Sequence, residues 1–258
     1  MERNEIRTEI FSYLKTEYPK AQPNPQISYI FEYLEKKHDE DFCKQYEEVI
    51  LDLIQEMINN SIIRPFTRSN GFSLFKLTAY GRECIETENL LLYDPDEYIK
   101  ELKKQIPKID EITIRYMKES ITTYHKDCLL SSTITLGTAS ENCMLLLIEA
   151  FAKAISDPEK REKFHKKIDG LFINAKYKKF REQFNSIEKF LPAALQEGID
   201  PQIDNIFNFI RINRNEAGHP TGTSLSKKEI LAFHQIFADY AKKIYSLIDY
   251  FSNNPVIL

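Results

Sequence analysis

The sequence predicts a mostly α-helical protein with two domains. The chain has 258 residues, and 42% of them are hydrophobic, which is enough to form one large core or two small ones. It contains only seven glycines and no tryptophan, while the helix-favouring residues Glu, Lys, Leu and Ile are abundant. Apolar residues recur at helical spacing in most of the chain, with one interruption where the spacing changes to two.

The first part of the chain predicts three helices followed by a hairpin. Apolar spacing places the helices at residues 4–18, 26–37 and 44–60. Residues 61–66 and 72–77 predict two strands, and the turn between them contains Asn70-Gly71, a strong hairpin signal. A short segment that begins at Thr78 closes this domain.

This order of elements resembles a winged helix-turn-helix domain. The stretch "FKLTAYGRECI" (residues 75–85) is similar to the segment that leads from the wing to the last helix in bacterial proteins of this kind. The resemblance covers about residues 1–90, and it implies a fold without identifying a ligand.

The third predicted helix, which reads DNA in such domains, carries four acids and one lysine. These residues are Lys44, Glu47, Glu48, Asp52 and Glu56. DNA phosphates would repel this face. We therefore expect the domain to dock a protein or to dimerise, with DNA binding as the alternative.

The rest of the chain predicts a linker and a helical bundle. Residues 91–108 form the expected linker, with a short charged helix that begins at Asp94-Pro95 and ends at Pro107. Residues 109–258 then show helical spacing throughout, which predicts the bundle. Its expected helices cover residues 111–127, 132–155, 158–185, 201–217 and 226–251.

Composition and local pattern argue against several classes of protein. The charged N-terminus does not resemble a signal peptide. The least charged run, Cys128–Ile148, is too polar to be expected to span a membrane. Four cysteines without a C-x-x-C pair favour free thiols over disulfides or zinc. We expect a cytoplasmic protein without a metal, a cofactor or a membrane partner.

The stretch "RINRNEAGHP" (residues 211–220) combines groups that can act on phosphate. Arg214, Asn215 and His219 lie within six residues, at the point where a helix ends. On an unbroken helix Arg214 and His219 would lie about 140° apart. Gly218 permits a left-handed cap and Pro220 pushes His219 out of the helical region, so the imidazole could swing back toward the arginine.

These residues resemble the signature of the HEPN superfamily. "RNEAGH" (residues 214–219) matches its R-x4–6-H motif, including the Asn after the Arg. "LGTASENCMLLLIEAFAKAI" (residues 136–155) resembles its second bundle helix, and residues 156–195 depart from the family as an insertion. The resemblance implies a dimeric helical bundle. Many members are metal-independent ribonucleases in toxin, phage-defence or RNA-processing roles, and others only bind RNA.

Glu141 is the only charged residue between Cys128 and Ile148. A buried carboxylate needs a cationic partner, and Arg211 and Arg214 are the candidates. If the pair is fully buried, Glu141→Ala should cost about 3–5 kcal/mol.

The expected chemistry is RNA cleavage without metal. His219 suits the proton transfers, and Arg214 suits the charge that develops on the phosphorane. Asn215 would position the phosphate or the imidazole, and Glu141 would hold the arginine. A two-fold dimer would bring two histidines into one cleft.

A basic stretch predicts the surface that contacts RNA. Residues 153–181 hold ten Lys and Arg against four acids. The expected RNA contacts are Arg211, Lys176, Lys178, Lys179 and Arg181.

Alternative interpretations stay open at this stage. His219 can be a helix cap favoured by the helix dipole, with Arg214 and Glu141 paired for structure. The bundle can bind RNA without cutting it, and the basic stretch can be a solvated helical face. For the whole protein, the alternative is a winged-helix DNA-binding regulator whose bundle only dimerises.

Overall fold

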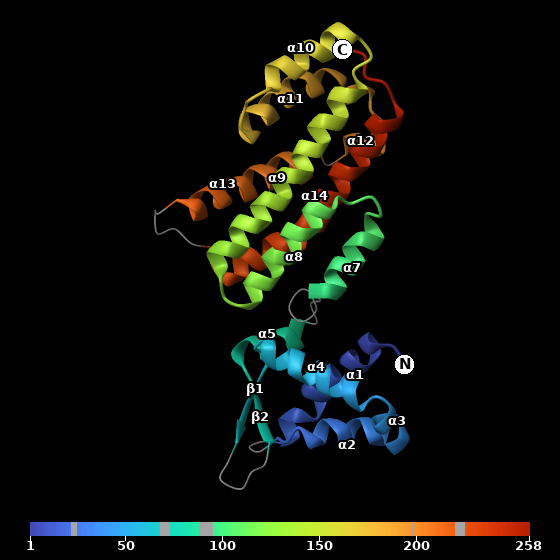
Figure 1. Cartoon of the computed structure of the whole chain (residues 1–258), viewed down its shortest axis with the longest axis vertical. Coiled ribbons are helices and arrows are strands. Elements are labelled where there is room, and N and C mark those ends of the chain that lie inside the picture. Colours follow the sequence, from blue (N-terminus) through green and yellow to red (C-terminus); the bar gives the residue numbers. More distant parts are fainter. Residues whose placement is uncertain (22–24, 68–72, 88–94, 198, 220–224) are drawn as a thin grey trace. The chain divides into compact units, whose positions relative to one another are not determined.

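The computed structural model describes residues 1–21, 25–67, 73–87, 95–197, 199–219 and 225–258. The chain divides into two compact units, Met1–Asp94 and Pro95–Leu258. Helices dominate both, and the described strands form one two-stranded antiparallel sheet (Figure 1). The mostly α fold class is therefore confirmed. The predicted turn at Asn70-Gly71 lies outside the described residues.

The first unit contains short helices and the hairpin. Its described elements are α1 (Arg3–Thr16), η1 (Tyr18–Ala21), α2 (Ser28–Lys37), α3 (Glu40–Gln45), α4 (Glu47–Asn59), β1 (Ile63–Thr67), β2 (Ser73–Leu77) and α5 (Ala79–Thr87). The predicted helix at 44–60 begins late in α3 and continues as α4, because the chain leaves the helical conformation at Tyr46. The Asp39 side chain caps α3 by accepting a hydrogen bond from the Phe42 N–H.

Apolar side chains from several helices fill the core of the first unit. Ile6 and Ile10 of α1, Ile30 of α2 and Leu53 of α4 are all fully buried. The two strands pair in register from Ile63–Leu77 to Thr67–Ser73. The apolar spacing of the sequence therefore marks the residues that bury their side chains.

The second unit is a helical bundle. Its described elements are α7 (Pro95–Gln105), α8 (Glu111–His125), α9 (Leu129–Ala154), α10 (Pro158–Ile168), α11 (Ile173–Ile187), η2 (Glu188–Phe190), α12 (Ala193–Gln196), η3 (Asp200–Asn205), α13 (Ile206–Gly218) and α14 (Lys227–Asn253). Residues 95–105, which we expected in a linker, form helix α7 of this unit. Helix α7 contacts α8, and the Tyr98 hydroxyl donates a hydrogen bond to the His234 carbonyl of α14.

Helix α9 is the central element of the bundle. It contacts α8, α13 and α14, and Figure 1 shows it running along the length of the unit. Among the described residues it is the one helix long and apolar enough to cross a membrane, whereas the sequence pattern suggested a segment too polar for that. Half of its most apolar window is buried inside the protein, as in the core helix of a bundle.

The basic stretch forms two helices instead of the single one predicted at 158–185. Helices α10 and α11 are separated by residues 169–172, where Gly170 has a φ of 65°. Glycine adopts this left-handed conformation at little cost, so it ends α10 and turns the chain. The predicted helix at 201–217 also differs, because it begins with the π-helical segment η3 before α13.

Candidate functional site at the end of helix α13

Helices α9 and α13 approach closely where Gly137 faces Arg214. A Cβ atom added to Gly137 would lie 2.4 Å from the Arg214 Cβ and 2.3 Å from its Cγ. Distances this short exclude any side chain at Gly137 unless α13 moves. The absence of a side chain at Gly137 thus lets the stem of Arg214 lie directly against α9.

Glu141 lies one helical turn after Gly137 on α9 and faces the same arginine. Arg214 Nη2 is 3.9 Å from Glu141 Oε2, and Arg214 Nη1 donates a hydrogen bond of 3.1 Å to Asn215 Oδ1. The side chain of Glu141 is 14% exposed, and that of Arg214 is 38% exposed. The structure therefore brings Glu141, Arg214 and Asn215 together at the rim of the bundle. The fully buried pair that we considered is not formed.

Burial dominates the electrostatics of Glu141. Loss of solvent raises the pKa of its carboxyl group, while the charges of Arg214 and Arg211 act in the opposite direction without cancelling the effect. The Nε atoms of both arginines are buried and have no hydrogen-bond acceptor among the described residues. The cluster therefore has donors that the described part of the chain leaves unused.

His219 stands apart from this cluster. Helix α13 continues through Gly218, which does not take the left-handed cap conformation that we expected. His219 follows with φ −108° and ψ 147°, and its N–H donates to the Glu216 carbonyl. Its side chain is exposed, and no described residue forms a hydrogen bond with the ring. The expected swing toward Arg214 is therefore not seen, and Pro220 lies outside the described residues.

The expected RNA contacts on α11 differ in whether an acidic side chain of the protein already pairs with them. Arg181 forms ion pairs with Glu188 at 3.3 Å and Asp204 at 3.0 Å, and its side chain is only 16% exposed. Lys179 pairs with Glu182. Lys176 and Lys178 have no acidic partner within 4.0 Å in the described part of the chain, so they are the available cations of α11.

Phe172 is a candidate contact that the sequence reasoning missed. It lies between α10 and α11 and is 90% exposed, next to Leu171, which is 36% exposed. The signal in the sequence was an apolar pair directly after Gly170, inside a lysine-rich stretch. An exposed aromatic ring among cations is the combination that binds single-stranded nucleic acids.

A buried Ser–His pair elsewhere in the bundle has a structural role. His234 is fully buried, and its Nε2 lies 2.7 Å from Ser120 Oγ. Burial lowers the pKa of His234 to about 3, with a smaller contribution from His125, so the imidazole is neutral. Ser120 Oγ also donates to the Ser132 carbonyl and thereby links α8, α9 and α14. No group of three or more potential metal ligands occurs among the described residues.

No family model, curated protein or solved structure matches this chain. The two resemblances therefore depend on the motifs quoted above.

A glycine-to-alanine comparison tests the α9–α13 contact. Gly137→Ala places a methyl group on the stem of Arg214, whereas the site at Gly218, at the end of α13, is open. Alanine is favoured over glycine in the interior of a helix, so the change at Gly137 would be the more stabilising of the two without the steric clash, and a lower stability of Gly137→Ala reports the clash. We expect Gly137→Ala to be less stable than Gly218→Ala by about 1–3 kcal/mol in urea unfolding followed by circular dichroism. Equal stabilities would contradict the close contact.

The raised pKa of Glu141 predicts a dependence of stability on pH. Because the folded pKa lies above the ordinary 4.5, protonation of Glu141 favours the fold. This contribution is fully present below about pH 4.5 and is lost as the pH rises through the folded pKa. The free energy of unfolding of wild type minus that of Glu141→Gln should therefore be larger at pH 4 than at pH 7.

At pH 7 the loss of the ion pair should cost less than about 1 kcal/mol, because Arg214 is partly exposed. Glu149→Gln, on the exposed side of the same helix, is the matched control. A Glu141→Gln loss of 3 kcal/mol or more at pH 7 would instead indicate a fully buried pair.

Proposed function

We propose that the protein is a metal-independent endoribonuclease or RNA-binding effector of HEPN type, with a winged-helix-like first unit. One observation carries the proposal. Helices α9 and α13 hold Glu141, Arg214 and Asn215 in one cluster, and the exposed His219 follows on the same segment. The resemblance to the HEPN superfamily also leads us to propose toxin action or phage defence as the biological setting.

The cluster suits the stabilisation of a phosphorane. Asn215 accepts a hydrogen bond from one terminal nitrogen of Arg214, and Glu141 lies near the other. A guanidinium held in this way needs little rearrangement when negative charge develops on a phosphate. Asn215 therefore positions the arginine in this proposal, and His219 takes the proton from the 2′-hydroxyl.

A second copy of the chain would complete the site. Cleavage needs both a base and an acid, and one motif supplies a single imidazole. Helix α13 also exposes two large apolar residues, Phe209 at 52% and Ile212 at 46%. In a two-fold dimer the same face of each copy can cover its counterpart and bring the two His219 side chains together.

The region between α10 and α11 provides an RNA-binding surface. The exposed ring of Phe172 can stack on a base, while Lys176 and Lys178 neutralise phosphates. Lys163 and Lys167 of α10 are also exposed and have no acidic partner within 4.0 Å among the described residues.

The competing function, a DNA-binding regulator, receives less support. Glu47, Glu48 and Asp52 are exposed on α4, so this helix presents negative charge to solvent. Glu56 is engaged by Arg7 at 2.9 Å and by Arg3 at 3.3 Å. An acidic helix surface repels duplex phosphates. It is better suited to docking a protein.

Cleavage without metal is the direct test. The full-length protein in EDTA should cut single-stranded or loop RNA and leave 2′,3′-cyclic phosphate ends, resolved on denaturing gels. His219→Ala should remove the proton-transfer group, and Arg214→Ala the phosphorane contact. Each should lower the rate by at least about 100-fold, the usual contribution of such a group.

The controls separate chemistry from folding and assembly. His38→Ala, in the first unit, should leave the rate unchanged, and circular dichroism should be the same for all variants. Ile212→Glu should give a monomer in analytical ultracentrifugation and lose cutting, because the dimer brings two motifs together. Cutting that survives both motif substitutions, or that requires added metal, overturns the nuclease assignment.

RNA binding can be tested separately from cutting, in the His219→Ala background. Phe172→Ala removes a stacking contact worth about 1–3 kcal/mol, so the Kd for single-stranded RNA should rise at least about fivefold. Lys176→Glu with Lys178→Glu should flatten the slope of log affinity against log salt by at least about one unit. Phe190→Ala, an exposed aromatic outside this region, is the control. Equal effects of Phe172→Ala and Phe190→Ala would contradict the proposed surface.

A further inference from the structure

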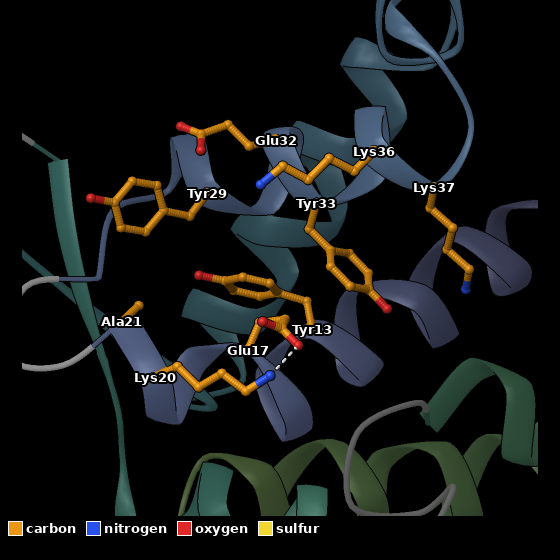
Figure 2. A pocket seen from close by; sticks show the side chains of 9 residues that line it. All are labelled: Tyr13, Glu17, Lys20, Ala21, Tyr29, Glu32, Tyr33, Lys36 and Lys37. Atoms are coloured by element: carbon orange, nitrogen blue, oxygen red, sulfur yellow. Dashed lines mark hydrogen bonds and ion pairs between the residues drawn. The ribbon is translucent and has the colours of Figure 1, made fainter.

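The first unit contains a solvent-open pocket of about 660 Å³ between α1, η1 and α2, called the cavity below (Figure 2). This volume lies within the range of small-molecule sites. Three tyrosines and charges of both signs line it. The lining residues are Tyr13, Glu17, Lys20, Ala21, Tyr29, Glu32, Tyr33, Lys36 and Lys37.

Tyr13 directs an unused hydrogen-bond donor into the cavity. Its side chain is only 2% exposed, and its hydroxyl has no hydrogen-bond partner among the described residues. Figure 2 shows the hydroxyl extending into the space beside Tyr29 and Ala21. Burial raises the pKa of Tyr13 to about 12, so the phenol keeps its proton at neutral pH. A ligand with an acceptor oxygen would satisfy this buried donor.

Two of the charged lining residues are available for a ligand. Lys20 pairs with Glu17 at 2.7 Å, and Lys37 pairs with Glu9 at 3.1 Å. Glu32 and Lys36 are not joined to an opposite charge within 4.0 Å in the described part of the chain. They lie four residues apart on α2, so one negative and one positive group stand on the same face, one helical turn apart.

The tyrosine rings supply a surface for a flat apolar group. Tyr13 and Tyr33 pack with their ring centroids 5.6 Å apart and their planes tilted by 55°. The Tyr33 hydroxyl donates a hydrogen bond to Ser12 Oγ and therefore points away from the cavity. The partly exposed ring of Tyr29 forms another side of the cavity in Figure 2. Aromatic rings bind other rings through offset or edge-to-face contacts.

We propose that this cavity binds a small zwitterion that carries an aromatic ring, in the chemical class of the aromatic α-amino acids. The ligand's ammonium group pairs with Glu32, and its carboxylate accepts hydrogen bonds from Lys36 and the Tyr13 hydroxyl. Its ring packs against Tyr29 and Tyr33.

The charges favour a zwitterion over a simple anion or cation. An anion would bind Lys36 but be repelled by the carboxylate of Glu32 one turn away. A cation would bind Glu32 but be repelled by the ammonium group of Lys36. An amino acid presents both charges a few ångströms apart and satisfies both residues. This site is independent of the RNA-acting function proposed for the second unit, so either proposal can fail without the other.

Isothermal titration calorimetry on the full-length protein tests the assignment. The probes are L-phenylalanine, L-tyrosine and L-tryptophan, compared with three fragments. Glycine lacks the ring, phenylethylamine lacks the carboxylate, and 3-phenylpropionate lacks the ammonium group. At least one aromatic amino acid should bind with a Kd below about 1 mM, and each fragment should bind at least about tenfold more weakly.

Single substitutions identify the groups that bind the ligand. Tyr13→Phe removes only the unpartnered hydroxyl, and Glu32→Gln and Lys36→Gln remove one charge each. Each should weaken binding by about tenfold or more, corresponding to one lost charged or buried hydrogen bond. Glu48→Gln, an exposed acid on α4, is the matched control and should leave the Kd unchanged. Thermal unfolding of each variant verifies that it is folded.

Three outcomes overturn the proposal. The first is that no aromatic amino acid binds at a ligand concentration of about 10 mM, which is well above the Kd expected for a specific site. The second is that 3-phenylpropionate binds as tightly as phenylalanine, which would indicate a plain anion site. The third is that the folded Tyr13→Phe, Glu32→Gln and Lys36→Gln variants all bind like Glu48→Gln, which would place any ligand elsewhere.

Discussion

The close contact between helices α9 and α13 determines the arrangement of the candidate site. Helix α9 is covered by α8, α13 and α14, and Gly137 lets α13 approach until the stem of Arg214 lies on the backbone of α9. The next turn of α9 carries Glu141, which therefore faces the same guanidinium. The absence of a side chain at Gly137 thus places the carboxylate of Glu141 on one helix beside the guanidinium of Arg214 on the other. A larger residue at Gly137 would separate them.

The electrostatic balance at this contact fits the binding site that we propose. Burial keeps the pKa of Glu141 raised although Arg214 and Arg211 oppose this effect, and both arginines retain buried donors without a described acceptor. A pair selected for stability would be expected to satisfy its donors, since each unsatisfied buried group is unfavourable. His219 follows on the same segment and is exposed, so in the proposed function a second copy of the chain completes its contacts.

The two units offer different chemistry. The second unit combines the arginine cluster with available lysines and the exposed ring of Phe172. The first unit presents acids on α4 and contains a cavity lined by tyrosines with one available acid and one available lysine. The acids on α4 therefore argue against nucleic-acid binding by that helix, and the volume of the cavity lies within the range of small-molecule sites.

The sequence alone determined the elements whose signals are local. Apolar spacing predicted most of the helices and both strands, because each element must bury one face. The motif at Arg214, Asn215 and His219 and the isolated Glu141 were also visible, because their residue types suit only a few kinds of chemistry. Local spacing predicted the helix boundaries less accurately. It missed the breaks at Tyr46 and Gly170, where the chain leaves the helical conformation. Gly170 could have been recognised as a break.

Tertiary structure decided which of these groups meet. The pairing of Arg181 with Asp204, the contact of Gly137 with Arg214, and the cavity around Tyr13 join residues from different elements. Local periodicity tells which face of a helix is apolar but not which helix covers it, at what distance, or which charged side chains remain unpaired. Those facts depend on the packing of whole helices, and they distinguish Lys176 from Arg181 although both belong to the same basic stretch.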